Sequence, residues 1–171
     1  MNKKTTVVTK VVALFALLLA ISVGAQQTSE VEPAFSPMPA ESLIQTNEEG
    51  VAIDGFDPVA YFDDNQAVKG LAVHNCEYLN KTWHFSSAEN RDKFLANPEK
   101  FSPQYGGFCA HSLTQNKLVK SNPESFLVKD DKLYLYVNDK QAKKDARRGT
   151  TKFEFTNNVR DKNWLTFESD F

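Results

Sequence analysis

The chain contains only two cysteines, Cys76 and Cys109, and three histidines among its 171 residues. A disulfide-rich miniprotein is therefore excluded, because such proteins need several cross-links to compensate for a small core. The core can instead use 13 phenylalanines, five tyrosines and two tryptophans, each of which buries a large apolar surface. Folding therefore does not depend on a disulfide framework.

Long hydrophobic segments are also scarce. The one extended apolar run, Val11 to Val23, has about 13 residues, fewer than the ~20 that span a bilayer. Three lysines precede this run, and Val23-Gly24-Ala25 places small residues at its end, as in a signal peptide. We predict cleavage after Ala25, a periplasmic or secreted protein, and no membrane insertion after cleavage. A retained membrane anchor is the alternative.

The sequence also has no excess of basic residues, since it contains 20 Lys and Arg against 22 Asp and Glu. Removal of residues 1–25 would take away three lysines and no acidic residue, so the remaining chain would be mildly acidic. Such a chain has no general electrostatic attraction to a phosphate backbone. We therefore expect no nucleic-acid partner.

The composition changes near position 48. Residues 26–47 are rich in Pro, Glu, Gln and Ser and poor in core-forming side chains, which predicts a flexible tether. Apolar spacing then begins, and residues 48–171 are long enough for one domain with a hydrophobic core. The predicted organisation is a signal peptide over 1–25, a tether over 26–47 and a single domain over 48–171.

Two β-hairpins are predicted within this domain. Segments 71–78 and 82–85 flank residues 79–81, and Asn80 tolerates the left-handed backbone of a tight turn. A two-residue loop would pair Cys76 with Trp83 and direct His84 to the other face, whereas a bulge would change these partners. A second hairpin is expected from 126–129 and 133–137, around Asp130-Asp131.

Helix signals occur between and after the hairpins. Ser86-Ser87-Ala88-Glu89 matches a capping box with Ser86 as the cap, which predicts a helix over 87–96. Further helical or turn signals lie at Asn97-Pro98, at Asn122-Pro123, over 138–148 and over 158–167. The acids of 138–148 (Asp139 and Asp145) are expected on a solvated face, and Trp164 is expected to anchor the last segment. The predicted fold class is α+β, a compact single domain with short antiparallel β-hairpins and several short helices.

Two short frames, His74-Asn75-Cys76 and Cys109-Ala110-His111, use both cysteines and two of the three histidines. Residues two apart on an extended strand project from the same face, so each frame is compatible with metal binding. Thiolate and imidazole together favour Cu(I), and tetrahedral zinc would also accept two cysteines and two histidines. The candidate ligands are Cys109, Cys76, His74 and His111. In an exported protein the same two cysteines form a disulfide by default, so a Cys76–Cys109 cross-link is the alternative.

Four segments carry a family resemblance: residues 55–62 (GFDPVAYF), 83–94 (WHFSSAENRDKF), 97–101 (NPEKF) and 104–110 (QYGGFCA). Together they resemble the YHS domain family, in particular its small exported members. The resemblance implies a compact α+β domain with a role in heavy-metal binding or sensing. It also implies that Cys109 carries the functional thiol.

Signals for catalysis are missing from the sequence. No serine lies in a nucleophile-elbow frame, and no glycine-rich loop follows a strand as phosphate binding requires. The residues Asp54, Asp57, Asp63 and Asp64 lie near Gly and Pro, a pattern typical of turns. The sequence therefore predicts an exported, non-enzymatic YHS-type protein that binds a transition metal, copper before zinc. The alternative is a disulfide-stapled accessory domain that presents an aromatic surface or groove to another cell-envelope protein or a small ligand.

Overall fold

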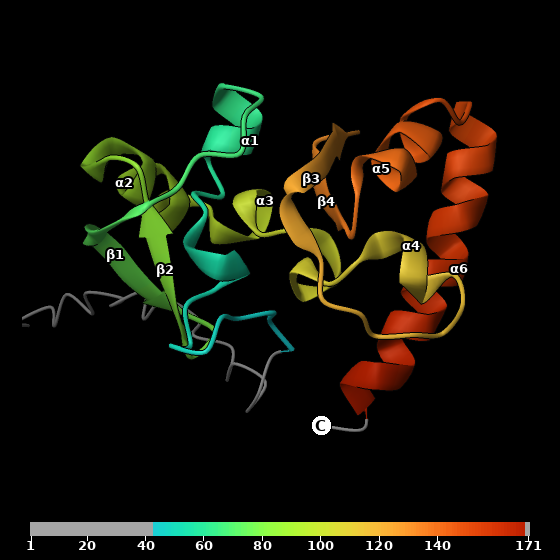
Figure 1. Ribbon diagram of the computed structural model, residues 1–171, viewed down its shortest axis with the longest axis horizontal. Coiled ribbons are helices and arrows are strands. Elements are labelled where there is room, and N and C mark those ends of the chain that lie inside the picture. The colour runs from blue at the N-terminus through green and yellow to red at the C-terminus, as the bar shows by residue number, and fades with distance from the viewer. Residues whose placement is uncertain (1–42, 170–171) are drawn as a thin grey trace, which may run out of the picture. The chain divides into compact units, whose positions relative to one another are not determined.

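Two antiparallel hairpins and the helices that pack on them make up the part of the chain that the computed structural model describes, residues 43–169 (Figure 1). The described residues belong to one compact unit, and the α+β prediction is confirmed. The predicted signal peptide and most of the predicted tether lie outside them. The elements are η1 (Ile53–Gly55), α1 (Ala60–Asp63), β1 (Leu71–Tyr78), β2 (Lys81–Phe85), α2 (Ala88–Ala96), α3 (Pro98–Phe101), η2 (Gln104–Gly107), α4 (Ala110–Leu113), β3 (Asn122–Lys129), β4 (Lys132–Tyr136), α5 (Asp139–Ala146) and α6 (Thr150–Ser169).

The first hairpin joins β1 and β2 through the two-residue loop Leu79-Asn80. Both loop residues have positive φ, 52° and 57°, as a type I′ turn requires. Cys76 therefore pairs with Trp83, as predicted for a two-residue loop, and a register shift follows between Leu71 and Asn75. Trp83 is fully buried, so this hairpin contributes to the core through one face of β2.

The second hairpin, β3 and β4, separates two hydrophobic clusters. We call the first the β2 core (Ala52, Ile53, Phe56, Val59, Tyr61, Trp83, Phe85, Phe94, Phe101, Leu133 and Leu135) and the second the α6 core (Tyr105, Cys109, Ala110, Leu113, Tyr134, Tyr136, Ala142 and Phe153). Successive side chains of a strand point to opposite faces. The leucines of β4 thus join the β2 core and its tyrosines join the α6 core, so β4 is buried on both faces.

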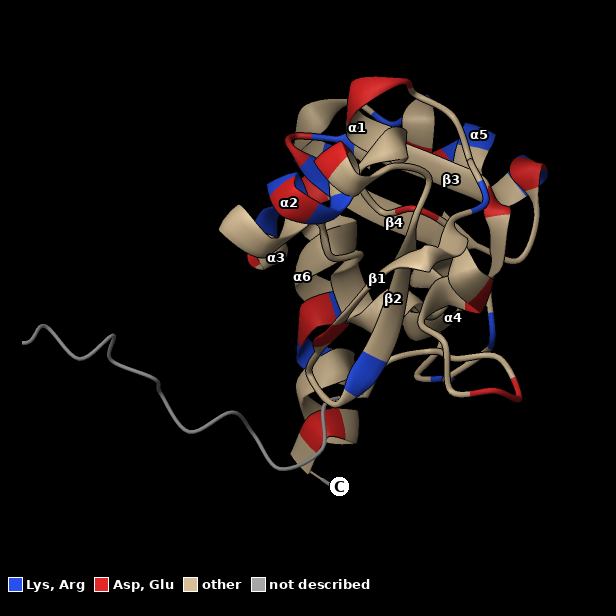
Figure 2. Ribbon diagram, turned by 90° about the vertical axis from the view of Figure 1, so that its left-hand side faces the viewer, with Lys and Arg blue, Asp and Glu red and all other residues tan. Residues whose placement is uncertain are grey.

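The helix α2 begins one residue later than predicted. Ser87, not Ser86, is the N-cap, and its side chain accepts a hydrogen bond from the backbone N–H of Asn90. The Ser86 hydroxyl instead donates to the buried carboxylate of Asp57 at 2.6 Å and accepts from the side-chain amide of Asn90 at 3.2 Å. Acidic and basic residues alternate along the exposed surface of α2 (Figure 2). The Asn97 cap and Pro98 start of α3 are confirmed.

Asp57 ties the turn before α1 to the start of α2. One carboxylate oxygen accepts from the backbone N–H of Val59 (2.9 Å) and of Ala60 (3.4 Å). The other oxygen accepts from the backbone N–H of Ser86 (2.8 Å), its hydroxyl, and the side-chain amide of Asn90 (2.7 Å). Asp57 has no exposed surface, so these five donors replace its hydration. Its role is structural, as its position before a proline predicted.

The Asn122-Pro123 pair starts a strand instead of the helical turn that its cap-then-proline pattern suggests. The side chain of Asn122 accepts from the backbone N–H of Glu124, and Asn122 pairs with Tyr136 at the start of β3. Proline is tolerated here because the first residues of a strand need not donate to the ladder. Pairing with the buried strand β4 therefore overrides the local helical signal.

The last two helices differ from prediction in length and burial. Asn138 caps α5 within the predicted helical stretch 138–148, but Asp145 is fully buried, so the solvated face predicted for it was wrong. Helix α6 begins at Thr150, well before the predicted segment 158–167. Trp164 packs against the α6 core, which agrees with its expected anchoring role.

The end of the predicted tether packs on the domain. The backbone N–H of Gln45 donates to Gly106 O at 2.8 Å, and its carbonyl accepts from Ile53 N at 2.9 Å. Its side chain accepts from the backbone N–H of Ser121 at 2.6 Å, and only 2% of Gln45 is exposed. Fixed contacts thus begin before position 48, where the sequence placed the domain boundary.

Candidate functional site

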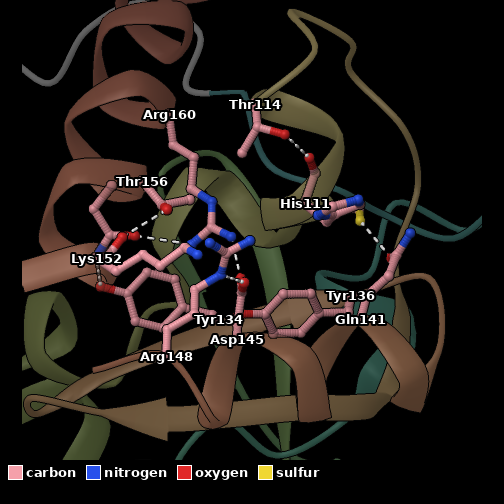
Figure 3. Close-up of polar contacts among 12 residues, drawn as sticks. His111, Thr114, Tyr134, Tyr136, Gln141, Asp145, Arg148, Lys152, Thr156 and Arg160 are labelled. Carbon is pink, nitrogen blue, oxygen red and sulfur yellow. Dashed lines mark hydrogen bonds and ion pairs between the residues drawn. The ribbon is translucent and has the colours of Figure 1, made fainter. Parts of the chain in front are cut away.

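Cys109 lies where the chain leaves η2 and enters α4. Its backbone N–H donates to Val119 O at 2.9 Å, and its side chain belongs to the α6 core with no exposed surface. The thiol points toward α5, where it donates to Oε1 of Gln141 at 3.4 Å (Figure 3). The carbonyl of Cys109 accepts from Ser112 N, so the thiol is fixed at the first turn of α4.

His111 belongs to the same turn and is half-buried. Its Nδ1 atom is buried and has no hydrogen-bond partner within the described part of the chain. Burial lowers the pKa of His111 below its ordinary value, and the nearby Lys144 lowers it further, against an opposing effect of Asp145. The unfolded chain therefore binds more protons than the folded one near pH 6, so His111 contributes stability at neutral pH that is lost as the pH falls. At pH 7 the imidazole is neutral, the form that binds metals.

Both residues interact with side chains of α5, Cys109 through a hydrogen bond and His111 through the charge of a lysine. Gln141 accepts the hydrogen bond of the Cys109 thiol, and the charge of Lys144 lowers the pKa of His111. These two residues are three positions apart on that helix. Residues at this spacing lie on the same face of a helix. We call Cys109, His111, Gln141 and Lys144 the Cys109 site.

A buried ion-pair network adjoins the Cys109 site (Figure 3). The carboxylate of Asp145 accepts from Arg160, from Arg148 Nε at 2.6 Å and from the hydroxyl of Tyr136 at 3.1 Å. Neither Asp145 nor Arg160 has exposed surface. Burial alone would raise the pKa of Asp145, but the two guanidinium groups and the Tyr136 hydroxyl outweigh it and hold the pKa below its ordinary value. The acid is therefore ionised at neutral pH.

The four predicted metal ligands do not come together. Cys76 and His74 lie on β1, where Cys76 packs against the β2 core, whereas Cys109 and His111 belong to the α6 core side. The strand β4 lies between these two cores, which is the physical reason for the separation. Within residues 43–169 no group of three or more His, Cys, Asp or Glu side chains is placed to hold a metal ion. The Cys109-Ala110-His111 frame is also helical from Ala110, not extended.

Both cysteines are free thiols, so the alternative of a Cys76–Cys109 disulfide is not formed in this structure. We expect alkylation in denaturant without prior reduction to modify both cysteines. In the native protein Cys76 should react before Cys109, because Cys76 is half-buried and Cys109 is fully buried. Mass spectrometry of alkylated protein distinguishes the two states. A chain that takes up no label until it is reduced would contradict the free-thiol structure.

Sequence reasoning missed Gln141, Asp145 and Arg160. Gln141 bonds to Cys109 at the start of α4, and Asp145 on α5 pairs with Arg160 on α6, so no local motif marks these contacts. A weak signal exists in α6, where Phe153, Thr156 and Arg160 are buried at spacings of three and four residues. An arginine within such a buried stripe indicates a buried acidic partner.

Comparisons with models of protein families, with curated proteins and with solved structures found no match. The resemblance to YHS domains therefore stays a prediction. Within the described residues, no helix has both the length and the apolar character needed to cross a membrane.

Proposed function

We propose that this chain is an exported, non-enzymatic YHS-type protein that binds a single Cu(I) ion through the Cys109 thiolate and the His111 imidazole. The observation that carries the proposal is the buried, unpartnered Nδ1 of His111 in the same helical turn as Cys109. A buried polar atom without a partner is costly unless it has a role that needs a free lone pair. Metal coordination is such a role.

The donors favour copper over zinc. Structural zinc sites are closed by four protein ligands, and catalytic ones by three, whereas the Cys109 site offers two soft donors. Cu(I) is selected by thiolates and accepts low coordination numbers. Cys76 and His74 are not part of this proposal, because they pack on the side of the β2 core.

Charge also favours a monovalent ion. One thiolate and Cu(I) form a neutral pair, so Lys144 beside His111 would not repel the bound ion. A divalent ion on the same two donors would leave a net positive charge next to this lysine. Gln141 holds the thiol proton at rest and must release it when the thiol ionises, so copper binding releases a proton.

Competition against a chromophoric Cu(I) chelator under reducing, oxygen-free conditions tests the proposal. The reduced protein should bind about one Cu(I), and Cys109→Ser should weaken binding by more than about tenfold, because thiolate is the softer and charged ligand. His111→Ala should weaken binding by a smaller factor. Cys76→Ser and His74→Ala are the matched controls and should leave the affinity unchanged.

Two results would contradict the proposal. One is copper uptake by wild-type protein no greater than that of Cys109→Ser. The other is an equal loss of affinity in Cys76→Ser and Cys109→Ser, which would require the two distant thiols to share one ion. Circular dichroism of each variant checks that the fold is retained.

A further inference from the structure

A cavity of about 250 Å³ lies on the domain away from the Cys109 thiol. Five pieces of the chain form its walls: residues 43–44, the end of β1 with its loop, helix α3 with the residues that follow it, the turn η2 and the C-terminal part of α6. The residues that carry the argument are Tyr78, Glu99, Tyr105, Gly106, Trp164 and Glu168.

Three aromatic residues, Tyr78, Tyr105 and Trp164, line this cavity. The rings of Tyr105 and Trp164 have centroids 6.1 Å apart and planes inclined by 62°, so they form a corner. The hydroxyl of Tyr105 donates to Asp161 at 2.8 Å, which fixes that ring. Tyr78 adds a third ring from the hairpin.

Gly106 permits this arrangement. Its φ is +57°, and a Cβ atom there would lie 3.2 Å from Cη2 of Trp164 and would collide with the carbonyl of Leu43. Only glycine adopts this backbone conformation without strain and leaves room for both neighbours. The corner between η2 and α6 is therefore built into the backbone.

Two carboxylates, Glu99 and Glu168, lie at the same cavity, and its lining contains no Lys or Arg. Neither carboxylate takes part in an ion pair within the described part of the chain. Burial, and then the charge of Glu99, raise the pKa of Tyr78. Acidic residues are visible along α6 toward its C-terminal end (Figure 2).

We propose that this cavity binds the alkylated ammonium group of a small organic cation. Aromatic faces attract such cations through the negative charge of the π system, and quaternary ammonium groups are recognised by aromatic cages. The two unpaired carboxylates supply the matching negative charge, while the apolar rings contact the alkyl groups. A bare metal ion fits less well, because these residues offer only two carboxylates and no third metal-binding side chain.

Titration of the full-length chain with choline, followed by the two indole N–H signals in nitrogen-proton NMR spectra, tests the inference. Trp164 lines the cavity, and Trp83 is fully buried in the β2 core with its indole donating to Tyr78 O. A Trp164→Phe variant assigns the two signals. Choline should shift the Trp164 signal in a saturable way. Its uncharged isostere, 3,3-dimethylbutan-1-ol, and sodium chloride at equal ionic strength should not.

Single-residue variants then locate the negative charge. Glu99→Gln and Glu168→Gln each remove one exposed carboxylate and should each weaken choline binding by about two- to fivefold, as expected for exposed charge pairs. Glu154→Gln, on the same helix but outside this cavity, is the matched control and should bind normally. Equal shifts with choline and its uncharged isostere, no shift at all, or unchanged affinity in both Gln variants would each overturn the proposal. None of these measurements involves copper, so the outcome is independent of the Cys109 site.

Discussion

Replacement of Asp57 by alanine is expected to lower the free energy of unfolding by about 4 kcal/mol, because five buried or half-buried donors lose their acceptor together. Three of these donors are backbone N–H groups, which cannot rotate toward water. The loss should affect α1 and α2 together, since Asp57 connects the turn before α1 to the start of α2. Urea unfolding followed by circular dichroism measures the change.

Asp63→Ala is the matched control for Asp57. Asp63 forms an exposed ion pair with Lys93 at 2.9 Å, and such pairs contribute at most about 1 kcal/mol. A fall in stability for Asp57→Ala that is no larger than the fall for Asp63→Ala would show that the five hydrogen bonds do not act as described. The loss of stability in Asp57→Asn should lie between the losses in Asp57→Ala and Asp63→Ala. The amide keeps one acceptor oxygen, but its two N–H groups face the donors that the second carboxylate oxygen accepted from.

Replacement of Asp145 by asparagine should destabilise the protein by about 3–5 kcal/mol, because it leaves the guanidinium of Arg160 buried without a counter-charge. Arg148 can turn to solvent more easily, since 16% of its side chain is exposed. The same interaction predicts acid sensitivity. The folded-state pKa of Asp145 is depressed, so its contribution is present above its ordinary pKa and is lost as the pH falls below about 4.

A double variant separates the ion pair from the surrounding packing. Asp145→Asn combined with Arg160→Met removes both charges and should recover much of the loss seen in Asp145→Asn alone, since the uncompensated charge is gone. Thermal and urea unfolding of the two variants provide the comparison. If the double variant were less stable than Asp145→Asn by the full cost of a second independent substitution, the two residues would not be coupled.

Local sequence was sufficient where a structural element depends on a few neighbouring residues. The turn signal at 79–81 predicted the first hairpin, and of the two loop lengths considered, the two-residue loop gives the observed pairing of Cys76 with Trp83, because loop length determines register. The Asn97 cap was predicted for the same reason, since a capping side chain bonds to N–H groups within its own turn. Ser86 was predicted as the cap, but its hydroxyl bonds to the distant carboxylate of Asp57, and Ser87 caps the helix.

The candidate site shows the opposite case. The sequence proposed Cys109 and His111 as ligands on an extended strand, whereas the structure places them at the start of a short helix. The sequence also grouped them with Cys76 and His74, which lie on the other side of β4. Gln141 and Lys144 were not identified, because α5 reaches the thiol only through the packing of the α6 core.

Composition and local pattern thus determined that this chain folds as an α+β domain with two hairpins, capped helices and an aromatic core. Tertiary structure alone decided that Asp145 and Arg160 are buried together, that β4 keeps the two cysteines apart, and that Trp164 and Tyr105 form one corner of a cavity. The physical reason is the separation in sequence between the atoms that interact. A turn or cap is stabilised by atoms a few residues away, whereas burial and contact depend on how elements distant in sequence pack, which no local pattern records.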